Sequence, residues 1–382
     1  MGEMREKDDG EGMSGTREEL TGVPGLARLV VVDRTGSTND DLRSALTGVD
    51  GRLDLRAAAA WPHISALWAR RQDAGRGRAG RRWITPPGSA LTVSFVLRPL
   101  VPAAALAWLP LLAGLAARDV VDAILISARA PWRARTKWPN DVVLVPNERA
   151  GEGIAAGAST GAGTGGGAGA AAVPVPAEIP GWGRARKVAG VLAELIPTAG
   201  GIGARTSAGT TGTADASGAV AAGAADAPGA VGAAGAPGGS APGGAVGADR
   251  GAACAVVLGI GVNTGQSESE LPVPWATSLR LAGARVEPRA LLEPLSARLD
   301  ELVTAWEAGE GDPDAGDGAL GAALRRACTT LGRRVRVDAP GGVLRGTAVD
   351  IAPGLVLRGA DGTMRTVDAG DVSHVRTDGA VD

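Results

Sequence analysis

The chain has 382 residues, enough for one large domain or two smaller ones, and only ten of them are aromatic, nine Trp and one Phe. A formal net charge of −2 provides no overall basic field to attract nucleic acid or an anionic membrane surface, so we expect neither as a partner. The two cysteines, Cys254 and Cys328, give no disulfide framework and no metal-ligand spacing, which fits a cytoplasmic protein.

Three segments stand apart by their composition. Residues 1–20 form a polar, acidic leader that lacks the basic and apolar regions of a signal peptide, and we expect it to be disordered. Residues 150–185 and 198–251 are nearly continuous Gly, Ala, Ser, Thr and Pro, which cannot bury a core, so both are predicted to be disordered insertions. Without these segments, roughly 270 residues of ordinary globular sequence remain.

The first predicted elements are a strand over 26–32 and a helix over 39–46, which Ser37 or Thr38 would cap. Strands are expected at 64–69 and 90–97, followed by a long helix over 103–127. Residues 99–117 carry no charge over 19 positions, as a membrane span would. Three prolines and a helical spacing that continues past this stretch favour a buried core helix instead.

Three strand-like pieces follow, at 136–144, where Pro139 interrupts the pattern, at 187–196 and at 254–263, and the two insertions lie between them. Helices are expected at 287–307 and 319–331. Short alternating strands separated by Gly-rich turns then predict a small SH3-like β-barrel over 332–382. The sequence therefore predicts an α+β fold, with a mixed or antiparallel sheet and packed helices over 21–331.

The loop after the strand at 64–69 reads Gly75-Arg-Gly-Arg-Ala-Gly-Arg-Arg82. It contains G-x-G-x-x-G, but no helix follows that would present its N-terminus to a pyrophosphate, so it is not a dinucleotide fingerprint. A solvated basic turn or an Arg-Gly segment of the RNA-binding kind would explain it. Guanidinium forks on a glycine-rich arm would equally suit a loop that closes over a nucleotide.

Lysine is rare in this chain: of 39 basic residues, only Lys7, Lys137 and Lys187 are lysines. An ammonium is a compact point charge that fits beside a reacting phosphate, so Lys137 and Lys187 are candidate catalytic residues. Lys137 begins the segment Lys-Trp-Pro-Asn-Asp141, whose last two residues form either an Asx turn or a group that orients a substrate or a metal-bound phosphate.

Gly259-Ile-Gly-Val-Asn263 ends a strand with two glycines, which either a tight turn or the close approach of a ligand would explain. Taken together, the cations, the Asp141 carboxylate and the Arg-Gly loop favour an adenylating site. In such a site a carboxylate attacks the α-phosphate of ATP, Mg²⁺ and protein cations offset the growing charge, and a loop excludes water.

These segments resemble the biotin protein ligase family. The likeness covers about 270 residues outside the leader and the insertions, and its motifs follow one another as Ser37-Thr-Asn39, Gln72, Gly75 to Arg81, Lys137 to Asp141, Lys187-Val-Ala-Gly190, Gly259 to Asn263 and Gly370-Asp-Val-Ser-His374. The resemblance implies a biotin/lipoate ligase-like catalytic domain before the SH3-like barrel. It also implies that biotin and ATP form biotinyl-5′-AMP, whose biotinyl group then passes to a lysine of a biotin carboxyl carrier domain of acetyl-CoA or acyl-CoA carboxylase.

The resemblance further implies a role for each motif. Lys187 would bridge the biotin carboxylate and the α-phosphate, and Arg78, Asp141 and Lys137 would complete the catalytic set. Residues expected to contact biotin are Ser37, Thr38, Asn39, Gln72, Arg76, Gly77, Arg78, Lys187, Gly190, Leu192 and Gly259. Residues expected to contact ATP or the adenylate are Arg78, Arg81, Trp83, Asn140, Asp141, Lys187 and Asn263, of which Asn263 is also the candidate Mg²⁺ ligand.

Two other functions compete with this one. Lipoate or octanoyl transfer would use a similar fold, but Gln72, the Arg-Gly loop and the C-terminal barrel argue against it. A nucleic-acid-binding module would use the Arg-Gly loop, but the acidic net charge and the lack of aromatic residues inside the loop argue against it. Only 36 residues precede Ser37, so we expect neither a DNA-binding domain nor a repressor function. Monomer and homodimer are both compatible with the sequence.

Overall fold

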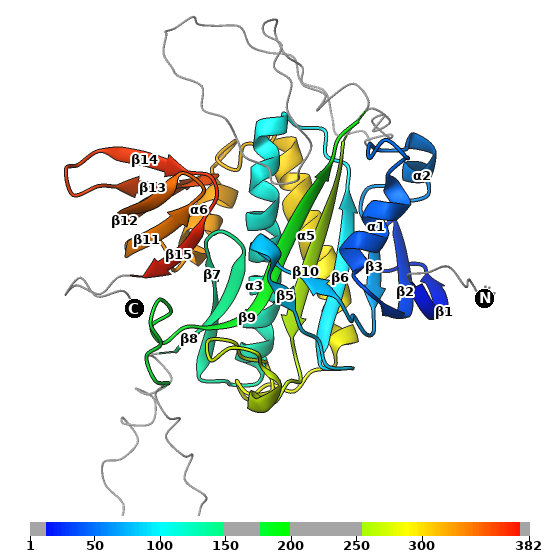
Figure 1. The fold of residues 1–382 in the computed structure, drawn as a ribbon, viewed down its shortest axis with the longest axis horizontal. Coiled ribbons are helices and arrows are strands. Elements are labelled where there is room, and N and C mark those ends of the chain that lie inside the picture. The colour runs from blue at the N-terminus through cyan, green and yellow to red at the C-terminus, as the bar shows by residue number, and fades with distance from the viewer. Residues whose placement is uncertain (1–12, 148–175, 199–253, 375–382) are drawn as a thin grey trace, which may run out of the picture.

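The computed structural model describes residues 13–147, 176–198 and 254–374 (Figure 1). Two larger sheets organise these residues, one of eight strands and one of five, and one hydrophobic cluster contains buried side chains of both. Residues 150–175 and 199–251 of the predicted insertions and residues 1–12 of the predicted leader lie outside the described residues. The predicted disorder is wrong for residues 176–185, because the amide of Ile179 donates to the carbonyl of Gly183 at 2.8 Å and Trp182 stacks on Trp275.

The large sheet has the strand order β1-β2-β3-β6-β10-β9-β8-β7. All neighbouring pairs are antiparallel except β2 and β3, so the sheet is mixed, as predicted. The strands are β1 (Met13–Leu20), β2 (Arg28–Thr35), β3 (Ser65–Ala69), β6 (Ala90–Leu97), β7 (Trp132–Lys137), β8 (Asp141–Pro146), β9 (Arg186–Ile196) and β10 (Ala255–Asn263).

Helices cover both faces of this sheet, which explains why β3 and β6 are buried along their whole length. On β10, Val256 and Leu258 belong to the core under α3 (Leu109–Ser127) and α5 (Leu292–Ala308), which lie side by side (Figure 1). Val257 belongs to a second core under α1 (Thr38–Leu46) and α2 (Leu55–Ala59). The alternation of side chains along a strand thus builds two cores from one sequence.

The predicted helix over 103–127 is confirmed as a core element. A 3-10 segment, Ala103–Trp108, leads into α3, whose side chains from Leu109 to Leu125 are mostly buried against the sheet. Within the described residues, no helix is long and apolar enough to cross a membrane. Another 3-10 segment, Pro288–Leu291, leads into α5 within the helix predicted at 287–307.

The disordered leader predicted for residues 1–20 is wrong for its second part. Met13–Leu20 forms the edge strand β1, which pairs with β2. Its acidic side chains meet arginines: Glu19 pairs with Arg28 at 3.0 Å and Glu18 with Arg70 at 3.3 Å. A run of charges that reads as a solvated tail is therefore also compatible with a charged edge strand.

Two further boundaries differ from the sequence prediction. The single interrupted strand expected at 136–144 is a hairpin, in which β7 and β8 are joined by Trp138, Pro139 and Asn140. The helix expected to reach residue 331 is α6 (Ala319–Ala327), and it ends early because the chain turns to pair with β7. There the amide of Thr329 donates to the carbonyl of Thr136 at 2.8 Å.

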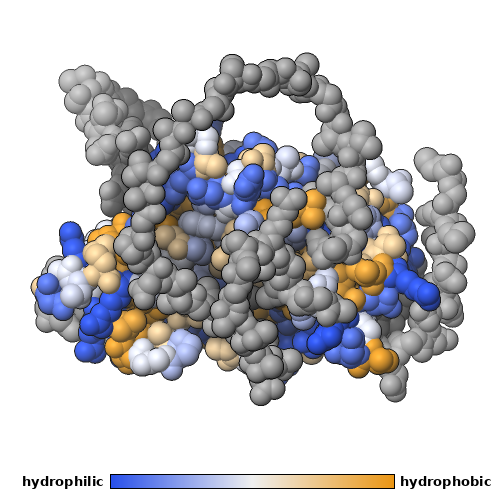
Figure 2. All heavy atoms as spheres, turned by 90° about the horizontal axis from the view of Figure 1, so that it is seen from above, coloured by the Kyte–Doolittle hydropathy of each residue, from blue (hydrophilic) through white to orange (hydrophobic). Residues whose placement is uncertain are grey.

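The small sheet lies beside α6 and β7, at the end of the molecule opposite to β1 and β2 (Figure 1). It is antiparallel, with the order β14-β13-β12-β11-β15, so β14 and β15 are its edges and closure into a barrel remains a prediction. Figure 2 shows hydrophilic residues spread among smaller hydrophobic areas on one face of the molecule. The five strands are β11 (Arg334–Ala339), β12 (Gly342–Ala352), β13 (Gly354–Arg358), β14 (Met364–Val367) and β15 (Asp371–His374).

Candidate active site

A cavity of about 370 Å³ opens on the face of the large sheet that carries α1. Its volume lies in the range of roughly 300–1,000 Å³ that is usual for small-molecule sites. Strands β6, β9 and β10 form its floor, and the first turn of α1, the Arg-Gly loop and residues 271–276 form its walls. The Arg-Gly loop here contains the short strands β4 (Gly75–Arg76) and β5 (Arg82–Trp83), with a 3-10 turn between them.

The cavity brings together all the predicted site residues except Lys137. These residues are Ser37, Thr38, Asn39, Gln72, Arg76, Gly77, Arg78, Arg81, Trp83, Asn140, Asp141, Lys187, Gly190, Leu192, Gly259 and Asn263. They come from segments far apart in the chain, and each sequence motif contributes only a few of the lining residues.

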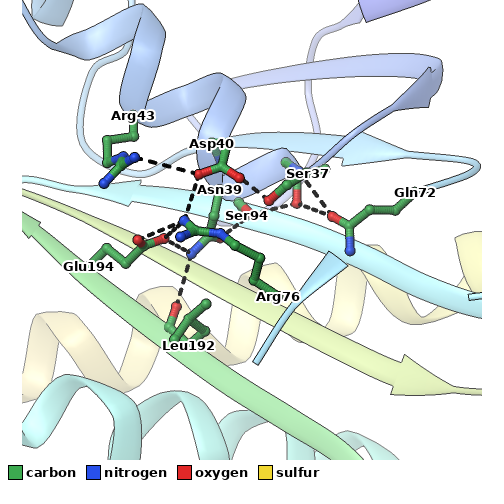
Figure 3. A network of polar contacts seen from close by, with 10 residues as sticks. Ser37, Asn39, Asp40, Arg43, Gln72, Arg76, Ser94, Leu192 and Glu194 are labelled. Atoms are coloured by element: carbon green, nitrogen blue, oxygen red, sulfur yellow. Dashed lines mark hydrogen bonds and ion pairs between the residues drawn. The ribbon is translucent and has the colours of Figure 1, made fainter. Parts of the chain in front are cut away.

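One end of the cavity is a buried chain of polar side chains. Ser37 caps α1, its hydroxyl accepting from the amide of Asp40 at 3.3 Å. Thr38 donates to the Gln72 amide oxygen through both its backbone N–H (3.0 Å) and its hydroxyl (3.2 Å). The hydroxyl of Ser94 lies 2.7 Å from that of Thr38 and 2.6 Å from Oδ1 of Asn39 (Figure 3). These groups suit a compact polar ring with its own donors and acceptors.

Further along the floor, Lys187 Nζ donates to Asp141 Oδ1 at 2.6 Å. Regular alternation along β9 would place Lys187 on the opposite face from Gly190. Between them the register shifts: Val142 pairs with Ala189 and Val143 with Lys187, so Val188 is an extra residue in β9. Such a bulge re-aims the side chain beside it, which places the ammonium in the cavity.

Three glycines keep the floor low enough for side chains to lie across it. A Cβ on Gly190 would lie 3.1 Å from Lys187 Nζ, and a Cβ on Gly261 would lie 2.6 Å from the Trp83 ring. A Cβ on Gly259 would overlap the Asn39 amide. The sequence left open whether a tight turn or the close approach of a ligand explains Gly259 and Gly261. In this structure the groups that approach these two glycines closely are side chains of the protein itself.

The arginines of the Arg-Gly loop have different partners. Arg76 pairs with Asp40 and Glu194, and Arg81 pairs with Asp371 of the small sheet. For Arg78, which is half-buried, the described residues provide no ion pair, and burial is the main influence lowering its pKa. A guanidinium remains charged despite such a shift, so Arg78 is available to an anionic ligand.

The charges that line the cavity are unequal. Arg76, Arg78, Arg81, Arg82 and Lys187 contribute five cations, and Asp141 is the one carboxylate among the lining residues that the structure describes. Three of the cations, Arg76, Arg81 and Lys187, are paired with carboxylates, so the excess positive charge comes from Arg78 and Arg82. The protein as a whole carries a formal net charge of −2, so the cationic lining is local. A partly enclosed cavity with this lining favours anionic ligands and stabilises negative charge that develops in a reaction.

Asn140 and Asn263, two of the four amide side chains that line the cavity, donate to backbone carbonyls. Asn140 donates to the carbonyl of Val191 at 2.8 Å. Asn263 donates to the carbonyl of Thr277 at 2.9 Å, and its Oδ1 accepts from Gln266 at 2.9 Å. The hydrogen bonds of Asn263 keep the turn after β10 in place.

Lys137 lies outside this cavity, with 4% of its surface exposed. Its Nζ donates to the carbonyl of Val372 in β15 at 2.6 Å and lies 4.4 Å from the centre of the Trp182 ring. Burial lowers its pKa. The structure therefore places Lys137 at the junction of the two sheets, outside the cavity that holds the other predicted site residues, and its catalytic role stays a prediction.

The sequence prediction missed the wall formed by residues 271–276. Trp275 lines the cavity and stacks on Trp182, with ring centres 5.8 Å apart. Its carbonyl accepts from the amide of Lys187 at 2.7 Å. A tryptophan shortly after the Gly259–Asn263 turn, in a chain with ten aromatic residues, was a signal that would have found this wall. The other lining residues outside the prediction are Arg82, Ile84, Thr92, Val93, Val191, Ile260, Gly261, Leu271, Pro272, Val273 and Ala276.

Two family models match parts of this chain. Residues 53–204 match the biotin/lipoate A/B protein ligase family, and residues 330–375 match the biotin protein ligase C-terminal domain. The chain belongs to the biotin protein ligase family. It is 28% identical over 367 residues to the biotin–acetyl-CoA-carboxylase ligase of Mycobacterium tuberculosis, a match that covers 94% of each chain.

A second relative and a solved structure extend this comparison. The biotin–acetyl-CoA-carboxylase ligase of Paracoccus denitrificans is 38% identical over 118 residues, which are 31% of this chain and 42% of that protein. The biotin protein ligase of Aquifex aeolicus, solved in complex with biotin and ATP, superimposes with a TM-score of 0.51 at 18% identity. That superposition covers 91% of this chain and 99% of the other, and it shows that the two proteins share a fold.

Proposed function

We propose that this protein is an ATP-dependent biotin protein ligase that forms biotinyl-5′-AMP and transfers the biotinyl group to a lysine of a biotin carboxyl carrier domain. The observation that carries the proposal is the Lys187–Asp141 pair on the floor of a cavity lined by five cations, with a buried polar chain at one end. A ligand with a polar ring, an aliphatic tail and a carboxylate matches this sequence of environments.

The ureido ring of biotin would bind at the end formed by Thr38 and Gln72, and its tail would run past Leu192. This orientation directs the biotin carboxylate toward Lys187. A carboxylate oxygen then attacks the α-phosphorus of ATP, the bond to the β-phosphate oxygen breaks, and pyrophosphate leaves. Lys187 and Arg78 offset the negative charge that develops on the phosphate oxygens.

Mg²⁺ fits this site as an ion brought in by the nucleotide. Among the described residues, no group of three or more His, Cys, Asp or Glu is placed to hold a metal ion, and Asp141 is the carboxylate that lines the cavity. Mg²⁺ commonly uses one or two protein oxygens and completes its shell with phosphate oxygens and water. Asp141 would hold it, with Asn140 or Asn263, and the bound ion would neutralise charge on the phosphates.

In the second step the lysine of the carrier attacks the acyl carbon of biotinyl-5′-AMP, the bond to the phosphate oxygen breaks, and AMP leaves as the amide forms. Asp141 accepts a hydrogen bond from Lys187, and it would orient the incoming lysine in the same way. The lysine ammonium must lose a proton before its nitrogen can attack, and the Asp141 carboxylate would accept that proton while it holds the amine beside the acyl carbon.

The test is incubation of the full chain with labelled biotin, ATP, Mg²⁺ and the biotin carboxyl carrier domain of an acyl-CoA carboxylase. We expect biotin-dependent release of pyrophosphate and label on the carrier. A carrier whose acceptor lysine is replaced by arginine is the matched control and should receive no label. Lipoate and octanoate serve as alternative acids, and pyrophosphate release with either of them but not with biotin would contradict the proposal.

A further inference from the structure

The Arg76 guanidinium joins three elements across the mouth of the cavity. Its Nη2 lies 2.8 Å and 3.0 Å from the two carboxylate oxygens of Glu194 on β9, and 2.6 Å from Oδ1 of Asp40 on α1. Arg76 itself belongs to β4, where the Arg-Gly loop begins (Figure 3). One side chain of the loop thus contacts both a strand of the cavity floor, β9, and a helix of its wall, α1.

Glu194 is a fixed partner. Its side chain is 15% exposed, and its Oε2 also accepts from Asn39 Nδ2 at 2.7 Å. Asn39 in turn lies 2.6 Å from the Ser94 hydroxyl, which leads through Thr38 to Gln72. The contacts of Arg76 therefore continue into the polar chain at the proposed biotin end of the cavity (Figure 3).

The charges around Arg76 balance. Two carboxylates, Asp40 and Glu194, face two guanidinium groups, Arg76 and Arg43, and Arg43 lies 3.7 Å from Asp40. The positive charge of Arg76 is consequently used within the protein, unlike that of Arg78. Within the Arg-Gly loop, Arg76 therefore contacts other parts of the protein, whereas Arg78 is available to the ligand.

We propose that Arg76 is a positioning residue: by bridging Glu194 and Asp40 it holds the Arg-Gly loop over the biotin end of the cavity and slows the release of bound biotinyl-5′-AMP. The identity of that ligand rests on the proposed function, whereas the contact itself does not. Arg76 touches neither reacting group, so its loss should act on retention of ligand more than on the chemical step.

The test compares Arg76→Gln and Glu194→Gln with Arg43→Gln. Each full-length variant is loaded with biotin, ATP and Mg²⁺, and release of biotinyl-5′-AMP is followed after dilution. We expect release about tenfold faster in Arg76→Gln and in Glu194→Gln, because each loses a charge-assisted contact. Glu194 does not line the cavity, so kcat for pyrophosphate release in Glu194→Gln should stay within about twofold of wild type. Arg43→Gln removes a neighbouring exposed charge and should release the intermediate at the wild-type rate.

The double variant Arg76→Gln, Glu194→Gln separates a direct contact from two independent effects. If the two residues act through each other, release in the double variant is no faster than in the faster single variant. Added salt should speed release in wild type and have little effect in the variants, because salt screens the ion pair. The proposal would be overturned if the double variant released biotinyl-5′-AMP faster by the product of the two single effects. It would also be overturned if Arg76→Gln released the intermediate at the wild-type rate.

Hydrogen exchange of residues 75–82 in the ligand-free protein provides a readout that does not depend on biotin. Faster exchange in Arg76→Gln and Glu194→Gln, but not in Arg43→Gln, is the expected result. If exchange is faster in Arg76→Gln and Glu194→Gln than in wild type, but wild type makes no biotinyl-5′-AMP, the proposed function fails and the loop contact stands. If wild type makes the intermediate and exchange is the same in all four proteins, the contact is not what holds the loop.

Discussion

At the scale of single residues, the two lysines outside the leader have separate tasks, although the sequence presents them alike. Lys187 lies in the cavity against Asp141, and Lys137 lies between the sheets against the carbonyl of Val372. Both positions use the compactness of an ammonium, in one case beside a ligand and in the other inside a packed junction. Rarity of lysine in the chain therefore marks positions with little room, and it does not distinguish chemistry from packing.

Replacing Lys187 by methionine keeps the length of the side chain and removes its charge. We expect biotin-dependent pyrophosphate release to fall at least about a hundredfold, because a cation that stabilises the charge of the transition state is lost. Thermal unfolding should change little, since the Lys187–Asp141 pair is partly solvated. Turnover close to wild type in a folded Lys187→Met protein would remove Lys187 from the mechanism.

Replacing Lys137 by methionine should give the opposite pattern. The variant loses a buried hydrogen bond and a contact with the Trp182 ring, while it no longer buries a charge, so we expect a net loss of about 1–2 kcal/mol in the free energy of unfolding. The kcat for adenylate formation should stay within about threefold of wild type. Urea unfolding measures the free energy of unfolding, and steady-state kinetics on the same preparation measures kcat. Unchanged stability with lost turnover would show that Lys137 takes part in catalysis.

At the scale of elements, the sequence predicted β6 within its observed bounds, and β9, β10 and α1 to within one or two residues, because each has a continuous apolar pattern or a capping signal. The failures have physical causes. Pro139 marked a break within a strand, and the chain reverses there instead, while the acidic Glu18 and Glu19 hid an edge strand whose charges meet arginines. Contacts between distant elements, such as Arg76 with Glu194, leave no trace in local pattern.

The strand β15 gives the protein a dependence on pH. Burial, together with Lys137 and Arg333, lowers the pKa of His374 from 6.5 to about 4, and its Nε2 has no hydrogen-bond partner within the described residues. Above pH 6.5 the imidazole is neutral in both the folded and the unfolded chain. As the pH falls from 6.5 toward 4, the unfolded chain takes up the proton first, so the folded state loses stability over this window.

We expect this loss to amount to about 1–2 kcal/mol between pH 7 and pH 5. His374→Gln stays neutral throughout and should show a correspondingly smaller decrease. Urea unfolding of wild type and variant at both pH values measures the difference. If the two proteins lose the same stability between pH 7 and pH 5, another group is responsible.

At the scale of the whole molecule, the site is assembled from both sheets and from segments that are distant in the chain. The large sheet provides the floor, α1 and the Arg-Gly loop provide the walls, and Asp371 of the small sheet holds Arg81. The sequence predicted most of these residues through the resemblance of separate motifs, and it missed Trp275, which belongs to none of them. Family motifs locate the residues of a site better than they locate its enclosing walls.

The antiparallel pairing of β9 with β10 makes the segment between them replaceable. Ile196 pairs with Ala255, so the two strand ends are already adjacent. Replacing residues 199–253 by a four-residue Gly/Asn/Ser turn should leave biotinylation close to wild type. Because the closed loop becomes much shorter, we expect about 1–2 kcal/mol more stability toward urea. Lost activity in a protein that still folds would show that the segment contributes to function.

Because Val188 is an extra residue in β9, the side of the sheet that Lys187 faces depends on the number of residues between Lys187 and Gly190. Side chains alternate along a strand, so one residue more or fewer between Lys187 and Gly190 would turn the ammonium toward the hydrophobic core under α3. Segments of very different length can be accommodated before and after β9 as long as the strand between them keeps its parity. A change of length at either end of β9 leaves the direction of Lys187 unchanged, whereas inserting or deleting one residue between Lys187 and Gly190 would remove the ammonium from the cavity.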